Sequence, residues 1–412
     1  MEVLYTRCCG IDIHAKMLVV CLINHGKKEI RTFSTMTDDI LRLSDWLVSA
    51  GCTHVVIEST GVYWKPVFNI LEGQMEVILV NARHVKAVPG RKTDVRDCEW
   101  LADLLCHGLL KASFIPPFEI RELRELTRYR HTLVKEQASV ANRIQRIIES
   151  GNIKLGQVAT DALGVSGREM MRALAEGQTD GEKLAELARG RLKSKKHELR
   201  RALEGRLTSA QRFVLGELLD RYDELEAAIA RANEQIGREV ATCTDPFVEE
   251  AIKLLQTIPG VGERVAEVIV SEIGVDMSRF PSDGHLSSWA GMCPGNDESA
   301  GKQRNGKTTK GNIHLRQALT QAAWAATHTK QTYLAAQYRR LVKPKGKKRA
   351  LVAVGHSMLV IIYHVLSRRS SYTELGGDYF DRRNVEVQRA KLIRKLELLG
   401  VKVTIEALAE VA

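Results

Sequence analysis

The sequence predicts an α/β domain followed by an all-α remainder, and three observations lead to this fold class. Residues 1–117 begin with strand-like segments and then alternate helix-like and strand-like stretches, the order expected of an α/β domain with a mixed sheet. Residues 118–245 repeat apolar side chains at helical spacing in a highly charged background. Residues 246–370 continue as a mainly helical domain, and a charged tail, 371–412, follows.

The first strands lie in CCGIDIHAKMLVVCLINHGKKEIRTFS, where β-branched and apolar residues dominate and His25-Gly26-Lys27-Lys28 supplies a turn. This segment predicts two or three strands. The later elements of the domain are predicted in this order: a helix over 38–50, a strand within 53–60, a helix-like stretch ending at Leu71, a strand within 76–82 and a helix within 94–110.

Two long helices are predicted in the middle region. The first begins at about Phe118, and its apolar positions continue to Ile147. The second carries an apolar seam of about three heptads, typical of a coiled coil, at Leu215, Leu218, Tyr222, Leu225, Ile229, Ala232 and Ile236. This seam packs either on the first long helix of the same chain or on another subunit, and the sequence leaves both alternatives open.

The stretch LLQTIPGVGERVAEVIVSEIG resembles a helix-hairpin-helix element, in which a glycine turn joins two apolar helices. Such a turn lets the backbone of Gly260 and Gly262 approach a phosphate closely, although an ordinary helical connection explains the same pattern. A helix from about Ile313, a basic loop over Lys343–Arg349 and a buried helix over 350–367 are predicted to follow.

The charge of the chain favours a polyanionic partner. Lys and Arg number 61 against 50 Asp and Glu, which gives a formal net charge of +11. The eight cysteines show no zinc-type spacing, so we interpret them as reduced thiols of a cytoplasmic protein, mostly small buried side chains. The first residues lack the pattern of a secretory signal, and no apolar run approaches the roughly 18 residues of a membrane span.

Four carboxylates form the first candidate site: Asp12, Glu58, Asp94 and Asp97. Asp12 lies between Ile11 and Ile13 in a strand, so its side chain points opposite to theirs. Glu58 ends an apolar strand, and Asp94 and Asp97 share one face at the start of a helix. Acids from two strands and a helix converge at the carboxyl edge of an open sheet, where Mg²⁺ or Mn²⁺ would offset their repulsion. For Asp94, a helix-capping role is an alternative.

These acids, in GIDIHAK, VVIESTGVYW and GRKTDVRDCEWLADLL, resemble the Asp-Glu-Asp-Asp set of the ribonuclease-H-like (RuvC-like) domain of DEDD-type insertion-sequence transposases. A second block of motifs is similar to the transposase domain of the same family: IPGVGERVAEVIVSEIG, FPSDGHLSSWAGMCPGNDESAGK and KGNIHLRQAL. The resemblance runs from about Cys9 to Leu366 and is poor across 151–215 and in the tail.

The resemblance implies that Ser299 is a nucleophile that attacks DNA and forms a phosphoserine link. The chain reads Ser299-Ala300-Gly301 where the family pattern is often Ser-Gly, so Thr308 and Thr309 are further candidate hydroxyls. A serine hydroxyl needs activation, which points to a metal at the acids. Cations that would hold the flanking phosphates are Lys302, Arg304, Lys307, Lys310 and Arg316. Without the resemblance, a solvated surface loop is the simpler interpretation of this segment.

The family further implies a bacterial recombinase that is guided by a structured noncoding RNA, bound to its DNA near the nucleoid, and dimeric, with a tetramer at synapsis. Two other functions stay open on the residues alone. One is a RuvC-like Holliday-junction nuclease, in which the acids activate water. The other is a nucleic-acid-binding scaffold without catalysis.

Overall fold

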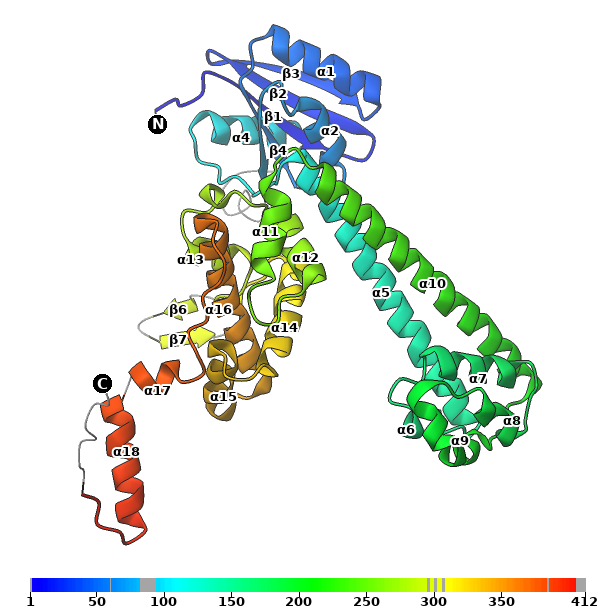
Figure 1. Ribbon diagram of the computed structural model, residues 1–412. Helices are drawn as coiled ribbons and strands as arrows, with labels where there is room; N and C mark the ends of the chain where they lie inside the picture. Colours follow the sequence, from blue (N-terminus) through cyan, green and yellow to red (C-terminus); the bar gives the residue numbers. More distant parts are fainter. Residues whose placement is uncertain are drawn as a thin grey trace. The chain divides into compact units, whose positions relative to one another are not determined.

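The computed structural model describes residues 2–59, 61–81, 94–294, 297–299, 302–305, 308–383 and 385–404 (Figure 1). Only the backbone is described for residues 94–96, 297–299, 302–305, 383, 385–388 and 391. The chain divides into two compact units, Met1–Ile115 and Pro116–Ala412.

The first unit is built on a five-stranded mixed sheet with strand order β3-β2-β1-β4-β5. Its strands are β1 (Arg7–Ile13), β2 (Met17–Asn24), β3 (Lys27–Ser34), β4 (His54–Glu58) and β5 (Glu76–Val80). The first three are antiparallel, whereas β4 runs parallel to β1 and β5 parallel to β4. This confirms the predicted mixed sheet. The β2–β3 turn uses His25 and Gly26, both with positive φ, as tight hairpins require.

Helices cover both faces of this sheet (Figure 1). On one face, Ile11 and Ile13 pack in a core cluster with α1 (Thr37–Ser49) and α2 (Trp64–Leu71). On the other face, Cys8 and Val56 pack with α4 (Asp94–Cys106). The alternation of side chains along β1 thus separates two cores, and it places Asp12 on the α4 face.

Gly10 brings α4 close to β1. A Cβ atom at Gly10 would lie 2.3 Å from the carbonyl oxygen of Cys98 and 2.5 Å from the amide nitrogen of Ala102. Both neighbours are backbone atoms of α4, so a side chain at position 10 would force the helix away from the sheet. A glycine two residues before Asp12 therefore fixes how closely α4 approaches the end of β1 that carries this acid.

The second unit contains two long antiparallel helices, α5 (Phe118–Ser150) and α10 (Ser209–Thr242). Gln211 donates to the Ser150 hydroxyl at one end, and at the other end the amide of Thr244 donates to Glu119. The predicted seam of α10 packs into a core cluster with α5, as the burial of Leu215, Leu225 and Ile144 shows. The intramolecular alternative for the seam is therefore the one observed.

Small helices between α5 and α10 complete that cluster: α6 (Leu155–Val158), α7 (Val165–Ala175), α8 (Gly181–Glu186), the 3-10 helix η1 (Gly190–Lys195) and α9 (Lys196–Leu203). Arg168 and Arg172 of α7 form ion pairs with Asp223 of α10. These contacts join the small helices to the end of the long pair, across the region where the family resemblance is poor.

The rest of the second unit is helical, apart from a hairpin of β6 (Asp297–Ser299) and β7 (Lys302–Asn305). Its helices are α11 (Phe247–Leu255), α12 (Glu263–Ile273), η2 (Met277–Arg279), α13 (Asp283–Trp289), α14 (Ile313–Thr327), α15 (Tyr333–Lys345), α16 (Lys347–Arg368), α17 (Tyr379–Arg383) and α18 (Val385–Leu398). In the part of the chain that the structure describes, α16 alone is long and apolar enough to cross a membrane. Here it is a core helix, which packs against α11, α13, α14 and α15.

The predicted basic loop over Lys343–Arg349 is wrong. Helix α15 continues through Pro344 to Lys345, and α16 begins at Lys347, so Gly346 alone joins them. Pro344 lies in the last turn of α15 and cannot donate to the carbonyl four residues earlier, but the turn is still closed by the amide of Gly346, which donates to the carbonyl of Val342. Gly346 then changes the direction of the chain with φ of 77°. The charged tail contains two helices, α17 and α18.

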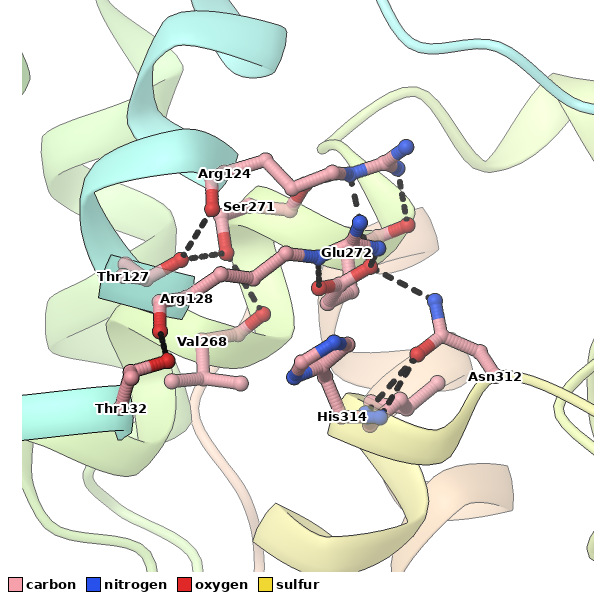
Figure 2. A network of polar contacts seen from close by, with 10 residues as sticks. Arg124, Thr127, Arg128, Thr132, Val268, Ser271, Glu272, Asn312 and His314 are labelled. Atoms are coloured by element: carbon pink, nitrogen blue, oxygen red, sulfur yellow. Dashed lines mark hydrogen bonds and ion pairs between the residues drawn. The ribbon is translucent and has the colours of Figure 1, made fainter. Parts of the chain in front are cut away.

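A buried carboxylate joins three helices of the second unit (Figure 2). Glu272 of α12 has a side-chain exposure of 0%. Arg128 of α5 donates to both its carboxylate oxygens, at 2.7 and 2.8 Å. Arg124, one turn earlier, lies 3.4 Å from Oε2 and donates to the carbonyl oxygens of Ser271 and Glu272. Asn312 donates to Oε2 at 2.6 Å.

Asn312 connects this network to α14. Its side-chain oxygen accepts from the amides of His314 and Leu315, so it caps the N-terminus of that helix while its amide group binds Glu272. Burial alone would raise the pKa of Glu272. The hydrogen bonds from Arg128 and Asn312 and the charge of Arg124 outweigh burial and hold the pKa below its usual range.

We expect Gly10→Ala to loosen α4 from β1, because the new methyl group overlaps helix backbone. The free energy of unfolding of the first unit should fall by about 1–3 kcal/mol, the usual cost of overpacking. Hydrogen exchange of peptides from β1 and α4 measures this. Gly237→Ala is the matched control, since nothing lies within 4 Å of a Cβ there. Unchanged protection of β1 and α4 in Gly10→Ala would contradict the packing argument.

Glu272→Gln should destabilise the second unit by about 3–5 kcal/mol at pH 7, because it leaves two arginines without their buried counter-charge. The pKa of Glu272 is lower in the folded than in the unfolded chain. Its contribution is therefore present above about pH 4.3 and is lost as the pH falls further. Urea unfolding should show a gap between wild type and variant that narrows on acidification.

Glu249→Gln is the control for this prediction, because Glu249 forms an exposed ion pair with Lys253 on α11. It should change stability by less than about 1 kcal/mol. Equal losses for the two variants would show that the Glu272 network does not stabilise the fold.

Candidate functional site

Two of the predicted acids lie on adjacent parallel strands at the carboxyl edge of the sheet. The register of β1 and β4 pairs Gly10 with Val56 and Ile11 with Ile57. The next positions along the two strands are Asp12 and Glu58. Both follow the pleat onto the face that α4 covers, since Ile11 and Ile57 belong to the opposite core cluster.

The other two acids lie in the first turn of α4, which begins at Asp94 as predicted. The backbone of Cys98 contacts Gly10, so the helix starts beside the end of β1. Burial raises the pKa of the Cys98 thiol to about 11, and the charge of Asp12 adds to this shift, which indicates that Asp12 faces the first turns of α4. Asp97 is half-buried, and the side chain of Asp94 lies outside the described residues.

The chemistry of these acids suits a hard divalent cation, because carboxylate oxygens are the ligands that Mg²⁺ and Mn²⁺ prefer. Among the side chains that the structure describes, no group of three or more His, Cys, Asp or Glu is close enough to hold an ion together. Asp12 instead contacts His14, with 3.1 Å between its Oδ2 and the Nε2 of the histidine. The topology thus brings Asp12, Glu58 and Asp97 to the carboxyl edge of the sheet, but their side chains are not close enough to coordinate one ion together.

A further acid of α4 has a structural partner. Asp103 pairs with Lys28 of β3, with 2.7 Å between Nζ and Oδ2. This ion pair joins the helix to the sheet two turns after Asp97. Asp103 is therefore a useful comparison for the acids at the sheet edge.

Ser299 lies at the end of β6 and pairs in register with Lys302 at the start of β7. A bulge between Asp297 and Glu298 interrupts the hairpin, and Pro294 and Thr308 form an isolated bridge below it. The backbone of Arg304 belongs to β7, while Lys307 lies outside the described residues. The sequence predicted no strands in this segment.

Two glycines close the base of this hairpin. A Cβ atom at Gly311 would lie 2.3 Å from the backbone of Ala290 and Gly291, and one at Gly291 would lie 2.6 Å from the amide of Gly311. The segments before β6 and after β7 therefore cross in backbone contact. Asn312 follows directly and is held by Glu272, so the base of the hairpin is tied to the buried network.

Arg316 braces the segment after β7. Its guanidinium donates to the hydroxyl of Thr308 at 3.2 Å and to the carbonyl of Thr309 at 3.5 Å. Arg316, which the sequence predicted as a phosphate ligand, therefore also has a structural role, in which the hydroxyl of Thr308 accepts a hydrogen bond from its guanidinium. Lys310 is exposed.

The glycine turn between α11 and α12 divides into two parts with different neighbours. A Cβ atom at Gly260 would lie 2.4 Å from the carbonyl of Ala322, so α14 fills the space beside this residue. Gly262 caps the N-terminus of α12 and has nothing within 4 Å of a Cβ position. The backbone at Gly262 is therefore the part of the turn that a ligand can approach.

The sequence interpretation missed Glu272, Asn312 and the two arginines of α5. A signal for them was present: Glu272 interrupts the apolar run VIVSEIG, and Arg124 and Arg128 stand four residues apart on a helix. A charge within an apolar helix needs partners, but the sequence does not say which ones.

Comparisons with known proteins agree with both halves of this arrangement. A family model described as a transposase, of the DEDD type and IS110 group, matches residues 9–152. A second model, described as transposase IS116/IS110/IS902 family, matches residues 252–339. The first covers the acids, and the second covers the hairpin with Ser299 and the Glu272–Asn312 contact.

Among curated proteins, the transposase for insertion sequence element IS1111A of Coxiella burnetii is 24% identical over 380 residues, 88% of this chain and 90% of the relative. The pilin gene-inverting protein of Moraxella bovis is 23% identical over 373 residues, 88% of this chain and 96% of the relative. A probable family 20 transposase of Pseudomonas aeruginosa is 24% identical over 368 residues, 88% and 94% of the two chains. With its acid-edged mixed sheet and serine hairpin, the chain belongs to the IS110 family of DEDD transposases and is a DNA transposase or recombinase.

Proposed function

We propose that this transposase cuts and rejoins DNA through a covalent phosphoserine at Ser299, with a divalent metal at the four acids. The observation that carries the proposal is the hairpin of β6 and β7. It has a fixed base at Gly291 and Gly311 and carries a serine at the end of its first strand. A nucleophile on a braced hairpin suits a reaction that depends on position.

The chemistry takes two balanced steps. In the first, the Oγ of Ser299 loses its proton and forms a bond to the DNA phosphorus, while the bond from phosphorus to the leaving strand breaks. The leaving oxygen takes up a proton and becomes a free hydroxyl. In the second step, a strand hydroxyl attacks the phosphoserine, joins the strands and releases Ser299. Each phosphodiester that is broken is replaced, so the exchange needs no external energy source.

Asp12, Glu58, Asp94 and Asp97 would hold the metal, Mg²⁺ or Mn²⁺. When bound, such a cation lowers the pKa of a hydroxyl and neutralises charge that develops on phosphate oxygens. The placement of Asp12 and Glu58 on neighbouring strand ends supports this assignment. The acids belong to the first unit and Ser299 to the second, so the reaction requires the two units to meet at one DNA phosphate, within a chain or across subunits.

The cations around the serine are proposed to bind the flanking phosphates: Lys302, Arg304, Lys307 and Lys310. Arg316 keeps the segment after β7 in place through Thr308 and Thr309, which supports a positioning role beside any phosphate contact. The amide of Gly262 at the start of α12 is a further phosphate donor, as in helix-hairpin-helix elements.

A structured noncoding RNA as guide, a dimer, and a tetramer at synapsis are part of the same proposal, and they rest on the family resemblance. The runner-up function is a metal-dependent Holliday-junction nuclease, in which the acids activate water and Ser299 takes no part.

Ser299→Ala should abolish strand exchange, by at least about 10³-fold, because no covalent link can form. Ser288→Ala is the matched control: it removes an exposed serine hydroxyl on α13 in the same unit and should leave strand exchange within about threefold of wild type. The measurement is a recombination assay on element-end and target DNA, with the adduct followed by denaturing electrophoresis. Cleavage that survives in Ser299→Ala would favour the nuclease.

Asp12→Asn should lower strand exchange by at least about 10²-fold, because it removes a charged metal ligand, and a chelator should do the same to wild type. Asp103→Asn is the control, because Asp103 lies further along α4 and pairs with Lys28 of β3. This variant should keep most of the strand-exchange activity. Asp12→Asn protein with full activity would rule out a metal site at the sheet edge.

A further inference from the structure

A cavity of about 170 Å³ lies between α5, α12 and α14 in the second unit. Its cationic walls come from Arg128 and Arg130 of α5 and from Arg264 of α12, and we call these three residues the arginine pocket. His131, His314 and Gln317 add polar groups to the same cavity. Among the side chains that the structure describes, none of the proposed metal ligands lines this cavity, and the proposed chemistry does not use it.

The acids near the arginine pocket are already engaged. The carboxylate of Glu272 accepts hydrogen bonds from Arg128 and Asn312 and forms an ion pair with Arg124. Glu267 accepts from Arg264 at 2.6 Å. Arg130 donates through Nε to the neutral amide oxygen of Asn233 at 2.5 Å, and among the described residues it forms no ion pair within 4.0 Å. The pocket therefore holds more positive than negative charge.

The excess of positive charge helps to lower the pKa values of basic groups in the cavity. Burial lowers the pKa of Arg130, and the charge of Arg264 lowers it further. Burial also lowers the pKa of His131 and His314, with contributions from Lys135 and Arg130 in the first case and Arg128 in the second. An anion in the cavity would relieve this repulsion.

Shape and exposure favour a phosphate. Guanidinium groups present forked donors that match phosphate oxygens, and Arg128 and Arg264 keep 41% and 38% of their side-chain surface exposed, so the pocket opens to solvent. Lys135 lies exposed on α5 one turn beyond His131. A buried core ion pair would show neither the surplus charge nor this access.

We propose that the arginine pocket binds one backbone phosphate of the DNA substrate, as an anchor separate from the reacting phosphate. This goes beyond the serine chemistry and rests only on the DNA substrate of the transposase family. Arg130 supplies a charge that the more distant Glu267 offsets only in part, and the Glu272 network keeps Arg128 in place beside it. DNA contact at this pocket would also link α5 to α14, the helix that follows the β6–β7 hairpin in the chain.

The test measures binding of element-end duplex DNA over a salt series, in a Ser299→Ala background and with a chelator present, so that neither serine chemistry nor metal-dependent hydrolysis occurs. Adding Arg130→Gln should lower affinity about tenfold and reduce the slope of log K against log salt by about one, the loss of one phosphate contact. Arg143→Gln is the matched control, because Arg143 is exposed on the same helix and does not line the cavity. It should leave the slope unchanged.

Gln317→Glu is a second variant that keeps the Arg130–Asn233 bond and introduces a negative charge into the cavity. It should weaken DNA binding in the same way. Slopes equal to the parent's in both variants would overturn the proposal. A loss seen only with an RNA duplex of equal length would overturn the assignment to DNA. A parent protein that binds no DNA, both alone and with the RNA that co-purifies with it, would instead contradict the transposase function itself.

Discussion

The buried carboxylate of Glu272 is the interaction on which the architecture of the second unit depends. An ionised group with 0% exposure is stable only when its charge is compensated and its oxygens are hydrogen-bonded. Arg124 and Arg128 supply the charge from α5, and Asn312 supplies a further donor from the start of α14. Three segments that are far apart in the sequence are thereby fixed to one another.

Both units use glycines, which have no side chain, to bring two backbone segments into contact. Gly10 lets α4 lie against β1 next to Asp12, and Gly291 and Gly311 let the two ends of the serine hairpin cross. At each place a single methyl group would overlap backbone atoms that cannot rotate away. The candidate nucleophile and the candidate metal ligands are thus each placed by backbone contact, which leaves little freedom to the elements that carry them.

Local patterns predicted much of the fold. The alternation of Ile11, Asp12 and Ile13 gave the correct face for the acid, and the change to helical spacing at Phe118 gave the correct start for α5. Apolar residues of α10 pack with α5 in one core cluster, but an apolar seam does not encode whether the facing helix belongs to the same chain. The basic segment Lys343–Arg349, predicted as a loop, is helical on both sides of Gly346, because charged residues at the ends of two helices have the same composition as a solvated loop.

What the sequence could not provide depends on contacts between distant residues. Strands β6 and β7 lack alternating apolar residues, so no periodic pattern in the sequence predicts them. The partners of Glu272 lie 144 and 40 residues away, and no local rule pairs them. The assignment of Ser299 and of the four acids came from the family resemblance together with the placement of carboxylates on apolar strands.

The central claim is that strands are exchanged through serine and never through water. Recombination carried out in water enriched in ¹⁸O tests it most directly, with mass spectrometry of the junction phosphates. The account predicts rejoined strands without ¹⁸O at the junction, because the only oxygens that attack phosphorus are those of Ser299 and of DNA hydroxyls. Junction or end phosphates that contain one ¹⁸O atom would show hydrolysis and would contradict it.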